Sequence, residues 1–169
     1  MNYFELYNIP VSLTFDQQEV KKKFYELSRQ YHPDFFSQNP EDEQADSLEK
    51  SSLVNRAYRT FQNPDATIKY VLQSKKLLEE EEKYQLPPEF LMEVMELNEQ
   101  LMDAKMEQET SALSNIQTQI NILQSEIYEP VKSIIEYYKE GVTTTEELLQ
   151  VKEYYFKRKY LNRILEGMA

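Results

Sequence analysis

Apolar residues along this chain recur mostly at spacings of three and four, which is the period of one face of an α-helix. Tyr3, Leu6 and Ile9 form a short face of this kind. The next helix has a good N-cap in Asp16, and Pro33 ends it because the residue before a proline disfavours the α region. The apolar face of this second helix consists of Val20, Phe24, Leu27 and Tyr31.

The middle of the chain predicts two further helices. The first begins near Glu41, and the turn signal Asn63-Pro64 separates it from a shorter one. Residues 74–86 contain the acidic run Glu79–Glu82, which is typical of a solvated stretch and makes this segment the best boundary between two domains. The apolar positions are Leu48, Val54, Ala57, Tyr58 and Phe61 in the longer helix, and Ile68, Val71 and Leu72 in the shorter one.

Three long helices are predicted after this boundary. Pro87-Pro88 opens the first of them, because proline is tolerated in the first helical turn. Pro130 kinks or interrupts the second, Gly141 is a candidate C-terminal cap, and Thr143–Glu146 resembles a capping box for the third. Short connections between long helices favour an antiparallel bundle.

The helix that begins at Pro88 carries two apolar stripes where a surface helix needs only one. The second stripe is rotated by roughly 100–200° from the first around the helix axis. It is therefore either a further part of the bundle core or a surface for a partner, and Glu96, Glu99 and Asp103 border it. The first stripe consists of Phe90, Val94, Leu97, Leu101 and Ala104, and the second of Leu91, Met92, Met95, Met102 and Met106.

Composition supports an all-α fold and removes several kinds of chemistry. Only two of the 169 residues are glycine, on which β-hairpins depend, whereas good helix formers are plentiful. The absence of cysteine excludes disulfides, thiol catalysis and cysteine-ligated zinc or iron–sulfur clusters within this chain. His32 is the only histidine and thus the only base for a nucleophile–histidine pair, so we expect no catalytic residue, metal or cofactor.

Charge and hydropathy limit the partners. The formal net charge of −11 repels phosphate backbones, so we expect no nucleic-acid partner. No stretch approaches the ~20 apolar residues that a membrane span requires, so we expect no membrane partner. The first residues have neither the basic start nor the apolar run of a signal peptide.

A basic-faced helix followed directly by His32-Pro33-Asp34 is the most specific motif of the chain. With the short helix NYFELYNI before it and a helix ending NRAYRTFQNP after it, this unit resembles a J domain, the module of DnaJ-type co-chaperones. The resemblance implies that the tripeptide contacts the ATPase of a DnaK-type chaperone and that a basic face docks by charge. The implied chaperone-binding residues are His32, Pro33, Asp34, Lys21, Lys22 and Arg29. In place of a further basic residue found in many J domains, this helix has Tyr25 and Glu26.

The C-terminal part narrows the resemblance to the HscB family of iron–sulfur cluster co-chaperones, with PPEFLMEVMELNE as its most specific piece. It implies a J domain over residues 1–73, made of a helical hairpin with short flanking helices. A linker over 74–86 and a C-terminal three-helix scaffold-binding domain of the HscB oligomerisation type over 87–169 follow. In that family the bundle binds an IscU-type scaffold and delivers it to HscA. The implied scaffold-binding residues are Leu91, Met92, Met95, Glu96, Glu99 and Tyr160, with Phe156 as an alternative to Tyr160.

The resulting hypothesis is a co-chaperone that binds an IscU-type scaffold and stimulates the ATPase of an HscA/DnaK-type (heat-shock protein 70) chaperone, without being an enzyme itself. Some eukaryotic members carry a cysteine-rich segment and a targeting sequence, so their absence favours a bacterial cytoplasmic form. Two alternatives remain open. One is a carboxylate-based or metal-assisted hydrolase, and the other is a general J-domain co-chaperone with a different client or a dimerising bundle.

Overall fold

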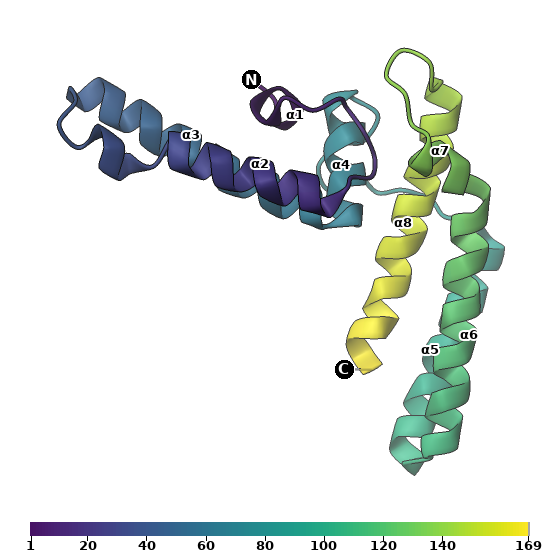
Figure 1. Cartoon of the computed structure of the whole chain (residues 1–169). Helices are drawn as coiled ribbons and strands as arrows, with labels where there is room; N and C mark the ends of the chain where they lie inside the picture. The colour runs from purple at the N-terminus through teal and green to yellow at the C-terminus, as the bar shows by residue number, and fades with distance from the viewer. Residues whose placement is uncertain (169) are drawn as a thin grey trace.

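The computed structural model describes residues 1–168 and shows an all-α protein, as the sequence predicts. Within those residues the chain forms helices only, and the long ones fall into an N-terminal hairpin and a C-terminal bundle (Figure 1). The helices are α1 (Tyr3–Tyr7), α2 (Gln17–Gln30), α3 (Glu41–Gln62), α4 (Pro64–Ser74), α5 (Pro88–Glu107), α6 (Thr110–Tyr128), α7 (Lys132–Glu136) and α8 (Thr145–Met168), with the 3₁₀ turns η1 (Pro33–Phe36) and η2 (Glu129–Val131).

The N-terminal part is a hairpin of α2 and α3 whose base is covered by α1 and α4. Asp16 caps α2 by accepting from the Gln18 N–H at 3.0 Å, as its position predicts. The Tyr7 hydroxyl is buried and donates to the Val54 carbonyl at 2.8 Å, which ties α1 to the middle of α3. The core of this part contains Phe4, Leu6, Tyr7, Leu13, Val20, Val54, Ala57 and Phe61.

The C-terminal part packs α5, α6 and α8 around a second core. The first stripe of α5, from Phe90 to Ala104, is buried in it, as predicted. Pro130 interrupts the helical path, because it lies in η2 between α6 and the short α7. The facing residues of this core are Ile116, Ile120, Leu123, Ile127, Leu161 and Ile164.

Three local predictions are wrong. Leu48 is 61% exposed and therefore lies outside the core, although it belongs to α3. The capping box of α8 is one residue later than predicted, since Thr144 accepts from the Glu147 N–H at 3.1 Å and Glu147 accepts from the Thr144 N–H at 3.0 Å. Gly141 does not cap a helix but occupies the loop between α7 and α8 with φ of 81°, a value that glycine adopts without strain.

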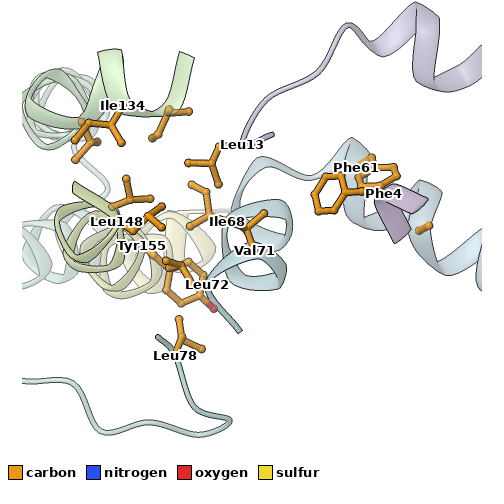
Figure 2. Close-up of a cluster of buried hydrophobic side chains, with 14 of the residues drawn as sticks. Phe4, Leu13, Phe61, Ile68, Val71, Leu72, Leu78, Ile134, Leu148 and Tyr155 are labelled. Carbon is orange, nitrogen blue, oxygen red and sulfur yellow. The ribbon is translucent and has the colours of Figure 1, made fainter. Parts of the chain in front are cut away.

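The first core extends into both parts, from the hairpin through α4 to η2, α7 and the N-terminal half of α8. Helix α4 packs along α8, and Figure 2 shows Ile68 and Leu72 of α4 facing Leu148 and Tyr155 of α8. Outside this apolar contact, the Arg158 guanidinium donates two hydrogen bonds to the Asp65 carboxylate, at 3.1 and 3.3 Å. The α2–α3 hairpin consequently projects from the bundle, giving the molecule the shape of an L (Figure 1).

Residues 75–87, here called the crossing segment, lead from α4 to α5 and pack on α8. The prediction of a solvated stretch holds for Glu79, Glu80 and Glu81, which are exposed, but Leu78 is buried. The Glu82 side chain is only 18% exposed and its carboxylate lies 2.7 Å from the Lys152 ammonium. The Tyr84 ring stacks on Phe156 with the ring centroids 4.6 Å apart. The segment therefore holds the two parts together along its length.

Candidate functional site

The His32-Pro33-Asp34 loop lies at the end of the hairpin remote from the bundle (Figure 1). His32 caps the turn η1, because its Nδ1 accepts from the Asp34 N–H at 3.2 Å. The neutral ring must then carry its proton on Nε2, which makes Nε2 a hydrogen-bond donor. The Asp34 side chain is 89% exposed and the His32 side chain 54% exposed, so both are accessible to a partner.

Hydrogen bonds from α3 fix the shape of this loop. Pro33 occupies the first position of η1, where its restricted φ favours the turn. The Gln44 side-chain amide donates to the Ser37 carbonyl at 3.3 Å and to the Asn39 carbonyl at 2.6 Å. The Ser37 hydroxyl donates back to the Asp34 carbonyl at 3.2 Å. Because these contacts order the loop before any partner arrives, the loop loses less conformational entropy when a partner binds.

The basic residues of α2 divide into two groups. Lys21, Lys22 and Arg29 are exposed, and none of them forms an ion pair within the described part of the chain. The third lysine of the run, Lys23, instead donates to the carbonyls of Tyr7 and Asn8 at 3.1 and 2.9 Å, where α1 ends. Lys23 therefore anchors α1, whereas Lys21, Lys22 and Arg29 form the exposed positive face.

A groove connects this positive face to the loop. Two exposed aromatic residues border it: Tyr25, 53% exposed on α2, and Phe35, 70% exposed in η1. The sequence singles out Tyr25 as a departure from the J-domain pattern but gives no sign of Phe35, since Phe35 and Phe36 are adjacent and only Phe36 turns toward the protein. The groove is lined by Lys22, Tyr25, Glu26, Ser28, Arg29, His32, Asp34 and Phe35.

The methionines of the second stripe of α5 are exposed, so of the two alternatives left open by the sequence the bundle core does not apply to them. Four of the six methionines of the chain line it, and all are more than half exposed. Their exposed fractions are 70% for Met92, 56% for Met95, 58% for Met102 and 84% for Met106. Methionine is polarisable and flexible, which suits an adaptable apolar contact surface.

The remaining predicted residues of this surface lie around the first turns of α5. Leu91 is half-buried, and it lines one groove together with Tyr160 of α8. Phe156, the alternative to Tyr160, lines the same groove but is 8% exposed beneath Tyr84, so Tyr160 offers the more accessible ring. Glu96 and Glu99 are exposed beside Met92 and Met95 and form no ion pair within the described residues.

Residues 1–168 contain no group of three or more acidic or histidine side chains placed to hold a metal ion. None of their helices combines the length and the apolar character needed to cross a lipid bilayer.

Comparison with known proteins covers both parts of the chain. Residues 2–70 match the family model of the DnaJ domain, and residues 86–169 match that of the HSCB C-terminal oligomerisation domain. The iron–sulfur cluster co-chaperone protein HscB of Mus musculus is 32% identical over 98% of this chain and 66% of its own length. The co-chaperone protein HscB homolog of Photobacterium profundum is 34% identical over 73% of each chain.

Solved structures agree with this relationship. The crystal structure of the human co-chaperone protein HscB superposes with a TM-score of 0.81 at 30% identity, over 99% of this chain and 80% of the human one. Chaperone HscB from Vibrio cholerae shares the fold, with a TM-score of 0.77 at 24% identity over 99% of this chain and 95% of its own. The order of the two matched domains, the identities and the fold together show that the chain belongs to the HscB family of J-domain co-chaperones.

Proposed function

We propose that this protein is a co-chaperone of iron–sulfur cluster assembly with two binding sites. In this proposal the His32 loop and the positive face of α2 bind an HscA/DnaK-type chaperone and stimulate its ATPase. The face of α5 formed by Leu91, Met92 and Met95 binds an IscU-type scaffold. Support for the client comes from the names of the relatives, which include an iron–sulfur cluster co-chaperone.

The observation that carries the proposal is the state of the His32 loop. It is ordered by hydrogen bonds from α3, exposed at the end of the hairpin, and joined by a groove to lysine and arginine side chains without ion partners in the described chain. Exposed cations accelerate encounter with an acidic surface, while an ordered loop lowers the entropy lost on docking.

The proposed binding of a scaffold depends on the exposed face of α5. Burying the exposed Met92 and Met95 against a partner removes apolar surface from water, and the acidic residues beside them favour a basic partner. Because the shared core holds the hairpin and the bundle in one body, a scaffold bound to α5 stays at a high local concentration near a chaperone bound at the loop.

Replacement of His32 separates the two functions. We expect His32→Gln to abolish stimulation of the chaperone ATPase, because the amide cannot reproduce the ring that caps η1 and presents a donor outward. Scaffold affinity is expected to stay within twofold of wild type, about 0.4 kcal/mol. Steady-state ATPase and calorimetric titration of the scaffold provide the two readouts, and loss of both activities in a folded variant would contradict the separation.

Replacement of the methionines has the opposite effect. We expect Met92→Ala with Met95→Ala to weaken scaffold binding at least tenfold, about 1.4 kcal/mol, while ATPase stimulation without scaffold is retained. Met106→Ala is a matched control at the far end of the same stripe. Unchanged scaffold affinity in the double variant would exclude this face as the binding site.

A dimerising bundle is the second candidate, because the exposed methionine stripe also suits a copy of the same chain. Light scattering at working concentration separates the two: a monomer excludes the dimer, whereas a dimer lost in the methionine variants supports it. The bacterial cytoplasmic location and the lack of intrinsic catalysis remain predictions, to be tested by fractionation and by assaying the purified chain alone for hydrolysis.

A further inference from the structure

A second groove adjoins the proposed scaffold face on the side of α8. It has a volume of about 600 Å³ and lies between the crossing segment, the first turn of α5 and the C-terminal half of α8. Its apolar lining comes from Leu86, Leu91, Phe156 and Tyr160. Leu91 and Tyr160 are also two of the proposed scaffold-binding residues, so the groove and the methionine face are continuous.

The rim of this groove is positively charged. Lys83, Lys159 and Arg163 line it, all three are exposed, and none forms an ion pair within the described part of the chain. The Arg163 guanidinium lies 5.6 Å from the centre of the Tyr160 ring, and the Lys159 ammonium lies 6.0 Å from that of Phe156. These contacts hold the two cations above the apolar lining.

The carboxylates near this rim form their ion pairs with other cations, and Lys159 makes only a minor contribution to the lowered pKa of Glu80. Glu82 lies 2.7 Å from Lys152, and Glu80 lies 3.3 Å from Lys69. In a chain with a net charge of −11, three unpaired cations around one apolar groove form a local exception. Such a rim attracts carboxylates, and the charge is most effective when the ligand also covers the groove and excludes water.

Charges of opposite sign adjoin the apolar residues at the start of α5. The cationic groove adjoins Leu91 and Tyr160, whereas Glu96 and Glu99 are exposed farther along the same helix, beside Met92 and Met95. A partner that covers both must present basic residues toward the two glutamates and acidic residues toward Lys159 and Arg163. Docking in the reversed orientation would bring like charges together, which is a common means of fixing register at protein interfaces.

We propose that the groove binds an acidic segment of the same scaffold partner, with an apolar side chain over Leu86 and Tyr160 and carboxylates at Lys83, Lys159 and Arg163. This proposal rests on the proposed function and adds to it the orientation in which the scaffold binds. The groove is a docking site for protein, because its apolar lining matches side chains.

The test compares Lys159→Gln/Arg163→Gln with Lys132→Gln/Lys139→Gln, a control that removes the same charge from exposed residues in and after α7. The probe is the IscU-type scaffold of the same organism, titrated calorimetrically into each protein at about 50 mM and about 500 mM salt, where screening differs strongly. We expect the groove variant to bind about threefold to tenfold more weakly at low salt, with a smaller difference at high salt, and the control to match wild type.

The outcomes separate the two proposals. Weakening confined to the groove variant, with circular dichroism unchanged, supports the groove. Equal affinities of the groove variant, the control and wild type overturn the proposed groove alone when Met92→Ala/Met95→Ala still weakens binding at least tenfold. A wild-type protein that does not bind the scaffold overturns both the proposed function and the groove.

Discussion

The joint between the two parts gives the most demanding structural prediction, and Leu72 is the residue that tests it. Leu72 is fully buried in the core shared by α4 and α8, and Figure 2 shows it beside Tyr155. Replacement by alanine removes buried methyl groups and leaves a cavity, which costs ~2–5 kcal/mol for leucine in a packed core. For a chain of this size, ~3 kcal/mol lowers Tm by roughly 6–12 °C.

The site of the substitution makes the form of the transition as informative as its midpoint. Because the first core joins α1 to α8, and α8 also contributes to the second core, we expect the hairpin and the bundle to unfold together. Two single-tryptophan proteins supply local probes, Tyr25→Trp on the hairpin and Tyr137→Trp after α7, since both side chains are exposed and the chain has no other tryptophan. Leu72→Ala should lower the Tm reported by both probes equally.

A matched control is Ile122→Ala, because Ile122 is 53% exposed on α6 and its loss should shift stability by less than ~0.5 kcal/mol. Two separate transitions, of which Leu72→Ala moves only the one reported by Tyr25→Trp, would refute the continuous core. The hairpin would then be a domain that contacts the bundle but unfolds independently of it.

Two further predictions concern the ends and contacts of α8. Thr144→Ala should lower the free energy of unfolding in chemical denaturation by about 1 kcal/mol, since it removes the reciprocal cap with Glu147. Glu146→Gln should change that free energy by less than ~0.5 kcal/mol. A larger loss for Glu146→Gln than for Thr144→Ala would contradict the observed position of the cap. The hydrogen bond from Lys152 holds the pKa of Glu82 below its usual value of 4.5, so its stabilising effect is complete above that pH and disappears as pH falls through the lowered pKa. The Tm difference between wild type and Glu82→Gln should therefore shrink between pH 7 and pH 3 in thermal melts, and a difference independent of pH would contradict it.

Much of the fold could be predicted because its boundaries depend on local chemistry. Pro33, Asn63-Pro64 and Pro87-Pro88 mark helix ends that proline enforces, and Asp16 caps α2 as its side chain allows. The buried stripe of α5 follows from helical period alone. The one-residue error at Thr144 arose because three successive threonines offer nearly equivalent caps, and only the path of the α7–α8 loop selects one.

Features that depend on distant contacts could not be predicted. The acidic run Glu79–Glu82 predicts a solvated stretch, but Glu82 forms an ion pair with Lys152, which lies 70 positions later along the chain. Apolar character alone gave Leu48 a core position, although its side chain faces away from the neighbouring buried Ser47 and is exposed. It also left the methionine stripe undecided between core and surface. The cationic groove combines side chains from three segments, so no local pattern reveals it.

The central claim is that one protein couples a scaffold to a chaperone, and steady-state ATPase measurement tests it most directly. Each DnaK-type chaperone of the organism is assayed alone, with this protein, with an IscU-type scaffold, and with both. We expect one dedicated chaperone to respond to the two together by more than the sum of the separate responses, and His32→Gln to remove that synergy. Stimulation that is the same with and without scaffold would contradict the coupling and leave only a general J-domain activity.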